Sequence, residues 1–501
     1  MPFPLLELPN ELLYKIFGEH FGEDQVPELF TISLTCKRLH DICLTHYLSR
    51  FGISHPAETC SFTLRNVVEP RPDAISGLRV ALFVPSIRHL VCTFDDALPE
   101  SEAPPPATIV ATVQRLQKLL SKLKFVNRMT LRFRGRDWNN GSVNVTDVLL
   151  ASWSSAIGDL LNLALDKSCT YLCIVDGKVM TYAYQFSRAG RGYPSNVLTT
   201  SRRTAIRGPD WTFRRVKMGT STILVNEATI PNELHSLDIQ SSMLLLPPLS
   251  HWTLSVLTVI TSLTISHISL AGHMWTALLP TVAQYASGIE ELCIAGCPDI
   301  TIDDLVAFLA LLPNLKILTL SDEEQYIPGP SAPVPKLTEL VRVEAPWRIL
   351  LHIVQGPLPN LKEVRTFPRR APRRGLDWEG TGAVLRVIRE CFRQQEIRPV
   401  VIIRIRVDKG WLSRVETRPS TGVRMTLRLV KVVEVELVEV KVGVGVLAAW
   451  LGGAFDAVRE IRIMGKVQPC CGSVEDIEEA VKKEVKLVGR VVVEERADYQ
   501  Y

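Results

Sequence analysis

The feature that most constrains the fold of this chain is a hydrophobic pattern that recurs along its middle third. The pattern Leu-x-x-Leu-x-Leu, with Ile or Val in some places and shortened in the last two copies, is centred on Leu237, Leu263, Leu292, Leu318, Leu340 and Val364. Successive copies are 26, 29, 26, 22 and 24 residues apart. The alternation is typical of a short strand with one buried face, and the period leaves room for a return segment. The sequence therefore predicts stacked repeats that bury their apolar sides against their neighbours.

The clearest repeat runs from Ile289 to Leu315. Cys297 stands where the chain is expected to turn out of the strand, and Asp303-Asp304 favour the start of a helix, because acidic residues stabilise its positive end. The expected core positions of this helix are Leu305, Phe308, Leu309 and Leu312. The unit resembles the cysteine-containing leucine-rich repeats. The resemblance is clearest over residues 234–366, and it implies an irregular, right-handed α/β solenoid.

Weaker signals extend this prediction in both directions. Strands are expected around 126–131, 169–174, 399–407, 432–446 and 458–463, with a helix at 148–165. The interval from 172 to 237 exceeds one period, so we expect an insertion or a degenerate repeat within it. Residues 54–107 contain the proline-rich stretch Pro99–Pro106 and are interpreted as a linker or transition segment. One continuous solenoid is therefore expected over 108–501.

Three short amphipathic helices are expected within Leu8–Phe51. The first follows Leu8-Pro9 with Asn10 as its cap, the second covers about Asp24–Leu34, and the third starts with Thr35 as its cap. A unit of this size buries little apolar surface alone. We therefore expect it either to pack on the following domain or to present apolar surface to a partner.

The ordered residues of this segment resemble an F-box. The match consists of Leu8-Pro9-Asn10-Glu11-Leu12-Leu13-Tyr14-Lys15-Ile16-Phe17 and Leu34-Thr35-Cys36-Lys37-Arg38-Leu39. Many members of the family carry an aromatic residue at the position of Leu39. The resemblance implies that residues 1–53 bind the Skp adaptor of cullin–RING ubiquitin ligases and, through it, a cullin, over about 1,600 Å². It implies adaptor contacts at Leu8, Pro9, Leu13, Ile16, Leu34, Cys36 and Leu39.

Amino-acid composition argues against several classes of protein. Apolar residues make up 46% of the 501 residues, which excludes a mainly disordered chain. The net charge of +4 argues against a protein that binds nucleic acid. The 11 cysteines form no disulfide framework and no secretory signal opens the chain, so we expect reduced thiols and a location in the cytoplasm or nucleus. The uncharged stretch Ile239–Ile289 is expected to form buried repeats and not a membrane span.

Linear motifs of catalysis are absent from the sequence. No phosphate-binding Gly-x-x-x-x-Gly-Lys-Ser/Thr, His-Glu-x-x-His, Gly-x-Ser-x-Gly or Cys-x-x-Cys occurs, so we expect no catalytic residue, metal or cofactor. Two basic runs, Arg365–Arg374 and Arg202–Arg215, are interpreted as solvated loops or as patches for an acidic or phosphorylated partner.

The expected function is that of a substrate receptor of a Skp–cullin–F-box ubiquitin ligase, which holds an unidentified target protein on the solenoid. The alternatives are a non-ligase F-box/repeat scaffold and an enzyme whose site has no linear motif. Side chains between the repeated leucines are expected to face the target, and the candidates are Glu290, Glu291, Lys316, Thr319, Glu339, Lys362, Glu363 and Arg365. The interval 176–233 is the alternative target-binding segment.

Overall fold

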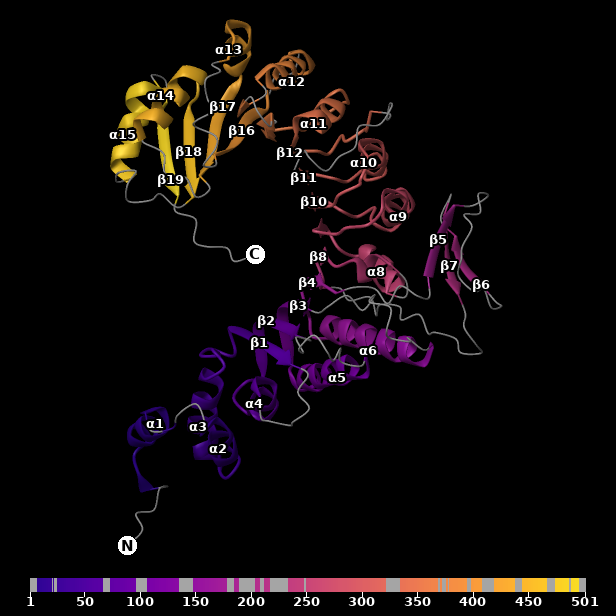
Figure 1. Ribbon diagram of the computed structural model, residues 1–501, viewed down its shortest axis with the longest axis vertical. Coiled ribbons are helices and arrows are strands. Elements are labelled where there is room, and N and C mark those ends of the chain that lie inside the picture. The colour runs from indigo at the N-terminus through magenta and orange to yellow at the C-terminus, as the bar shows by residue number, and fades with distance from the viewer. Residues whose placement is uncertain are drawn as a thin grey trace. The chain divides into compact units, whose positions relative to one another are not determined.

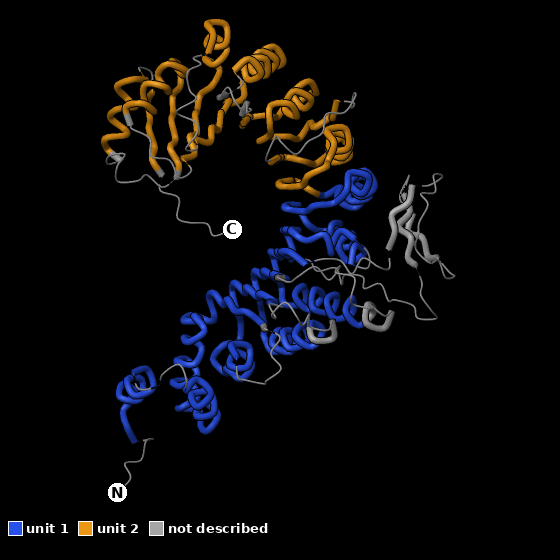
Figure 2. Tube along the Cα trace, in the orientation of Figure 1, with its two compact units in different colours: residues 1–288 blue, residues 289–501 orange. Residues whose placement is uncertain are grey.

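The computed structural model describes most of the chain and divides it into two compact units, Met1–Gly288 and Ile289–Tyr501 (Figure 2). The described residues are 7–19, 21, 25–65, 73–95, 106–134, 147–177, 184–188, 203–207, 211–216, 233–246, 249–320, 334–367, 370–371, 375–376, 378–393, 398–407, 419–437, 444–465, 474–485 and 488–494. In both units, parallel strands alternate with helices, and neighbouring strands in the sheet are successive repeats (Figure 1). The predicted α/β repeat solenoid is confirmed.

The first unit opens with the three predicted helices, α1 (Asn10–Glu19), α2 (Val26–Ser33) and α3 (Lys37–Ser49). The start of α3 differs by one residue from the prediction. Cys36 is its N-cap, while the hydroxyl of Thr35 donates to the carbonyl of Ile32 at the end of the preceding helix. Thr35 therefore serves α2 and does not cap α3.

The parallel sheet of the first unit follows in the order β1-β2-β3-β4-β8-β9. Its strands are β1 (Thr59–Arg65), β2 (Ser86–Asp95), β3 (Phe125–Arg134), β4 (Tyr171–Asp176), β8 (Ser236–Gln240) and β9 (Ser262–Ser266). The helices between and after them are α4 (Ala74–Val80), α5 (Pro106–Lys122), α6 (Asp147–Asp166), α7 (Ser242–Leu245), α8 (Ser250–Leu257) and α9 (Gly272–Tyr285). The uncharged stretch of the sequence thus forms repeat strands and helices, as predicted.

The repeats begin earlier than the sequence predicts. Segment 54–107, which the sequence predicts to be a linker or transition segment, contains β1 and β2, which pair in parallel with each other, and β2 pairs with β3. Leu90, Met129 and Leu172 occupy equivalent positions 39 and 43 residues apart. These first repeats carry long helices, so their period lies outside the 20–29 residues that mark the later ones. The proline-rich stretch itself lies mostly outside the described residues.

The expected insertion lies between β4 and β8. It contains β5 (Tyr184–Arg188), β6 (Arg203–Arg207) and β7 (Trp211–Val216), which form an antiparallel sheet in the order β5-β7-β6. β4 pairs directly with β8, so the parallel ladder continues past the inserted strands. The basic run around Trp211 belongs to these strands.

The sheet of the second unit has the order β10-β11-β12-β13-β16-β17-β18-β19. These strands are β10 (Glu291–Ala295), β11 (Ile317–Leu320), β12 (Arg342–Pro346), β13 (Glu363–Phe367), β16 (Val400–Val407), β17 (Val430–Leu437), β18 (Glu460–Gly465) and β19 (Arg490–Glu494). The helices are α10 (Ile302–Leu309), α11 (Trp347–Val354), α12 (Trp378–Cys391), α13 (Thr421–Leu427), α14 (Val444–Ala454) and α15 (Val474–Glu484), and a short antiparallel pair joins β14 (Arg370–Ala371) to β15 (Gly375–Leu376).

The pattern at 337–340 was assigned to the wrong register. Leu318 of β11 lies opposite Val343, and Val343 lies opposite Val364 of β13, so Val343 and not Leu340 is the central residue of this repeat. Leu337 and Leu340 are buried before the strand begins, which is why they imitate the motif. The valine-rich segment expected as one strand over 432–446 is also divided, because β17 ends at Leu437 and α14 begins at Val444.

The repeat at 289–315 follows the prediction closely. Gly296 adopts a positive φ of 61°, and the buried thiol of Cys297 donates to the carbonyl of Ala295, 3.4 Å away, where the chain leaves β10. Thr301 caps α10, and its hydroxyl accepts from the backbone amide of Asp304 at 3.0 Å. The predicted core residues Leu305, Phe308, Leu309 and Leu312 are buried.

Candidate functional site

The three N-terminal helices leave an apolar surface exposed. Leu12 and Leu34 keep 47% and 55% of their area exposed, and Tyr14 is also exposed. Among the residues predicted to bind an adaptor, Pro9 and Leu34 are exposed, while Leu8, Ile16 and Cys36 are partly exposed. We call Pro9, Leu12, Ile16 and Leu34 the N-terminal apolar surface.

Two of the predicted adaptor residues lie inside the helical unit. Leu13 is 0% exposed and Leu39 is 6% exposed. The helix period places Leu13 on the face of α1 that packs on α3, one residue from the exposed Leu12. Both residues hold the helices together in this structure, and the adaptor contact at Leu13 and Leu39 that the resemblance implies stays a prediction. Leu12 was missed because neighbouring apolar residues on one turn do not reveal which of them is buried.

Two arginines, one in α3 and one directly after it, form hydrogen bonds at the two ends of α1. The guanidinium of Arg38 donates to Oδ1 of Asn10 at 2.8 Å and also to the carbonyl of Leu8. At the other end, Arg50 donates to the carbonyls of Gly18 and Phe21, at 3.2 and 2.6 Å. These bonds hold both ends of α1 and thereby fix the position of Leu12 relative to Leu34.

The third helix also packs on the first repeat. Tyr47 is fully buried, and its hydroxyl donates to the carbonyl of Asp73 at 2.8 Å. The carboxylate of Asp73 caps α4, and its Oδ1 and Oδ2 both accept from Nη2 of Arg115 on α5, at 2.8 and 2.6 Å. A Cβ at Gly77 of α4 would lie 2.6 Å from the ring of Tyr47. The helices and the first repeats therefore form one packed body within the first unit.

A buried histidine, His40, links the same helix to the loop after α4. Nδ1 of the buried His40 lies 2.9 Å from the carbonyl of Ser33, and Nε2 lies 3.3 Å from the backbone amide of Leu82. The carbonyl requires a proton on Nδ1 and the amide requires a lone pair on Nε2, so the two partners define one tautomer. Leu82 and the next residue of this loop, Phe83, are both exposed.

A second candidate surface is the open face of the sheet in the second unit. Eight charged residues from β12, β13, β16, β17 and β18 alternate there and form what we call the charged ladder: Arg342, Glu344, Glu363, Arg365, Arg404, Glu434, Glu460 and Arg462. Four arginines and four glutamates balance one another. The ladder therefore presents alternating charge and no net charge to a partner.

Glu434 lies at the centre of the ladder and is only 2% exposed. Its carboxylate accepts from Nε of Arg404 at 3.0 Å and from Nη1 of Arg462 at 3.2 Å. Nη1 of Arg365 lies 3.3 Å from the same carboxylate. The hydrogen bond to Glu460, together with the charges of Glu460 and then Glu434, raises the pKa of Arg462 against the opposing effect of burial.

The second buried carboxylate, Glu344, repeats this arrangement on β12. Nη1 of Arg404 lies 2.8 Å from Glu344, so Arg404 bridges the two buried glutamates. Nη2 of Arg342 lies 3.6 Å from Glu344. Arg404 also lies over the ring of Phe367, with its guanidinium carbon 5.7 Å from the ring centroid. The guanidinium groups are thus held in defined positions on the sheet.

The predicted target-facing residues fall into three groups. Glu363 and Arg365 belong to the charged ladder and pair at 2.6 Å. Thr319 and Glu291 lie on β11 and β10 of the same sheet. Glu290, Lys316, Glu339 and Lys362 precede their strands, and Glu290 pairs with Lys316 at 2.7 Å. The strand position assigned to Glu339 is wrong, because β12 begins at Arg342.

Most of the ladder was missed by sequence reasoning. Glu344 and Arg342 were missed through the register error at Leu340, and Arg404, Glu434 and Arg462 lie beyond the clear repeats. The alternation Val-Val-Glu-Val-Glu at 432–436 and Ile-Arg-Ile-Arg at 403–406 carried the available signal. The Arg365–Arg374 loop lies largely outside the described residues.

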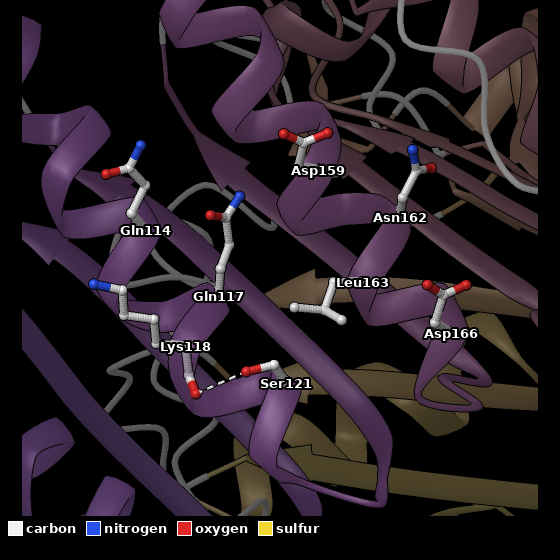
Figure 3. A pocket seen from close by; sticks show the side chains of 8 residues that line it. All are labelled: Gln114, Gln117, Lys118, Ser121, Asp159, Asn162, Leu163 and Asp166. Atoms are coloured by element: carbon white, nitrogen blue, oxygen red, sulfur yellow. Dashed lines mark hydrogen bonds between the residues drawn. The ribbon is translucent and has the colours of Figure 1, made fainter.

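A polar groove of about 540 Å³ runs between α5 and α6 (Figure 3). The residues that line it are Gln114, Gln117, Lys118, Ser121, Asp159, Asn162, Leu163 and Asp166. Several of these groups already have partners, since Gln117 donates to the carbonyl of Ala156 at 2.8 Å and Asn162 accepts from Trp252 at 2.9 Å. The groove therefore offers few unpaired polar groups for a ligand.

The buried thiols of the first unit lack the features of reactive cysteines. Burial raises the pKa of Cys60, Cys169 and Cys173 to about 12, so these side chains are protonated thiols at neutral pH. Within the described ranges, no group of three or more His, Cys, Asp or Glu residues could hold a metal ion. The helices in the same ranges are too short or too polar to cross a membrane.

Comparisons with known proteins give only distant likenesses to solved structures. No family model and no curated protein matches the chain. Among solved structures, the leucine-rich repeat-containing protein LegL7 from Legionella pneumophila is 10% identical with a TM-score of 0.36, over 85% of this chain and 98% of LegL7. A structure of the Rad7 and Elc1 complex in yeast is 12% identical with a TM-score of 0.34, over 91% of this chain and 88% of the matched chain. Likenesses this distant carry no inference about function.

Proposed function

We propose that the chain is a substrate receptor of a Skp–cullin–F-box ubiquitin ligase. The N-terminal helices, which resemble an F-box, bind the Skp adaptor through the N-terminal apolar surface, and the repeats bind a target protein. The observation that carries the proposal is the pair of exposed leucines, Leu12 and Leu34, on a helical unit that is packed on the first repeats through Tyr47 and Asp73. Exposed apolar residues on a small helical unit are characteristic of a protein interface.

The mechanism requires no catalytic residue in this chain. A receptor acts by raising the concentration of its target near a separate conjugating enzyme. Such an effect depends on a defined geometry between the adaptor-binding helices and the repeats. The contacts among Tyr47, Asp73 and Arg115 support such a geometry within the first unit.

The charged ladder is the proposed target-binding surface. Its guanidinium groups are held by neighbouring carboxylates, so a partner that binds them finds side chains that have already lost much of their rotational freedom. A polar protein surface with alternating charge complements such a face, whereas a small apolar ligand requires a deep apolar pocket.

Affinity capture with matched variants tests the proposal. Leu34→Asp places a carboxylate in the apolar contact and should abolish recovery of the Skp adaptor and the cullin, because burying an unpaired charge costs several kcal/mol. Leu311→Asp is the control, since Leu311 is 50% exposed on the second unit. Equal recovery of the adaptor with both variants would refute the proposed interface.

The alternative is a non-ligase scaffold that uses the same helices. A ligase receptor should recover a cullin together with the adaptor, whereas a scaffold should recover the adaptor alone. The same capture therefore separates the two functions.

A further inference from the structure

The second unit carries a row of cations where its strands begin. We call Lys362, Arg398, Lys431, Arg459 and Arg490 the basic edge. Backbone hydrogen bonds place these residues at the same end of neighbouring strands: Val400 to Lys362 at 2.8 Å, Arg459 to Lys431 at 3.0 Å and Arg490 to Arg459 at 3.1 Å. Neighbouring strands lie about 4.8 Å apart, so the row extends for about 19 Å along β13, β16, β17, β18 and β19.

A cavity of about 450 Å³ opens at the middle of this row. Its charged lining consists of Arg389 and Arg393 at the end of α12, with Arg398 and Lys431 of the basic edge and one carboxylate, Glu390. Glu390 lies 3.4 Å from Nε of Arg389 and 3.7 Å from Nη1 of Arg393. No carboxylate in the described part of the chain pairs with Arg398 or Lys431. The lining of the cavity therefore contains four cationic side chains and one carboxylate.

An irregularity in the sheet places Lys431 at the cavity. Val401 lies opposite Val430, but Ile402 lies opposite Val432, so β17 has one extra residue and that residue is Lys431. Such bulges redirect a side chain at the cost of a local break in the ladder, and they occur often next to binding sites. The bulge explains why a lysine within a valine-rich strand reaches the rim of the cavity.

The remaining lining of the cavity is apolar. Phe392 and Val401 are buried, and Leu429 is partly exposed. A cavity with an apolar floor and a cationic rim fits an apolar side chain flanked by anionic groups. Its volume is within the range of sites that enclose a side chain or a small ligand.

We propose that the basic edge binds an extended acidic peptide segment, with one apolar side chain of that segment in the cavity. The row is one residue wide, which matches an extended chain. Nucleic acid fits less well, because the charged ladder beside this row is balanced, with Glu363 paired to Arg365 and Glu460 paired to Arg462, and offers no broad cationic surface to phosphates. That this peptide belongs to a ubiquitination target rests on the proposed function, while the peptide site itself does not.

Fluorescence anisotropy with the full chain and a labelled peptide tests the proposal. The probe is a peptide of alternating Glu and Ser with one central Leu, and a second peptide has Gly in place of Leu. The Leu peptide should bind about tenfold more tightly than the Gly peptide, as expected for burial of one aliphatic side chain. Leu429→Ser should remove this preference.

Charge-reversal variants test the role of the cationic residues that line the cavity. Arg398→Glu with Lys431→Glu should weaken binding at least about tenfold, whereas Lys118→Glu with Lys124→Glu, which change the net charge equally on the first unit, should have no effect. Circular dichroism monitors folding, and Arg398→Gln with Lys431→Gln replaces the reversal if the reversal unfolds. Adaptor binding measured on the same samples should be unchanged, so failure of this site and failure of the proposed function are distinguishable.

Two results would overturn the proposal. One is that neither peptide binds the wild-type chain at low ionic strength. The other is that single-stranded oligothymidylate binds more tightly than the Leu peptide and is insensitive to Leu429→Ser, which would make the edge a polyanion site for nucleic acid.

Discussion

Removing the central carboxylate of the charged ladder should open the sheet of the second unit. Glu434→Gln keeps the shape of the side chain and removes its charge. The amide nitrogen would then face a guanidinium group in place of one of the two carboxylate oxygens, of which Oε2 now accepts from Arg404 and Oε1 from Arg462. Three arginines around Glu434, including Arg365, would lose their shared anion.

The expected loss of stability in Glu434→Gln follows from how deeply Glu434 and its arginine partners are buried. Removing one partner of a fully buried pair costs about 3–5 kcal/mol, whereas an exposed pair contributes about 0–1 kcal/mol. Glu434 is buried, but the side chains of Arg365, Arg404 and Arg462 are 14%, 22% and 32% exposed and keep bonds to other glutamates. An intermediate loss of about 2 kcal/mol is expected, which corresponds to about 30-fold in the opening equilibrium.

Hydrogen exchange read by mass spectrometry measures this opening. Peptides that cover β16, β17 and β18 should exchange about 30-fold faster in Glu434→Gln, under conditions where exchange reports the opening equilibrium. Glu339→Gln makes the same chemical change at an exposed position before β12 and should shift exchange by less than about 0.5 kcal/mol. Identical exchange in the two variants would refute the assignment of Glu434 as the centre of the ladder.

Three further predictions concern the first unit and the cysteines. Gly77→Ala should lower the thermal midpoint of the first unit by an amount equivalent to about 1–3 kcal/mol, because the new Cβ would lie 2.6 Å from the ring of Tyr47. The control Gly422→Ala should not destabilise the protein, because no described atom lies within 4 Å of the Cβ position. Burial, followed by the charge of Arg50, lowers the pKa of His46, so the unfolded state takes up more protons than the folded state on acidification. The contribution of neutral His46 to the free energy of unfolding is complete above the ordinary histidine pKa and is lost as the pH falls below it. Thermal melts should therefore show a decrease in stability from pH 7.5 to 5.5, and a smaller decrease in His46→Gln. A brief iodoacetamide pulse at pH 8 should modify the exposed Cys391 and spare Cys173, whose pKa burial raises to about 12; equal labelling would contradict the described packing.

The repeat architecture was predictable because each repeat reports its own strand through local spacing. Leu292 and Leu318 are central residues in both the pattern and the register. The pattern failed at Leu340, since a buried leucine before a strand satisfies the same spacing as one within it. It also missed β1 and β2, because the 17-residue helix α5 places Leu90 of β2 and Met129 of β3 39 residues apart, although Ile87-x-x-Leu90-x-Cys92 has the expected form with cysteine in the last apolar place.

The candidate surfaces were less predictable than the fold. Leu12 and Leu13 are neighbours with the same side chain, and only the packing of α1 on α3 determines which of them is exposed. The ladder depends on pairs that are distant in sequence, such as Arg404 with Glu344 and Arg365 with Glu434. Such pairs arise from strand register, which no local motif records.

Direct titration of the purified chain with a purified Skp adaptor tests the central proposal. The proposed function predicts a 1:1 complex with the wild-type chain and with Leu311→Asp, and a loss of affinity of at least about 100-fold with Leu34→Asp, since burial of an unpaired carboxylate costs more than about 2.8 kcal/mol. Absence of binding to the wild-type chain, or equal affinity for all three proteins, would contradict it.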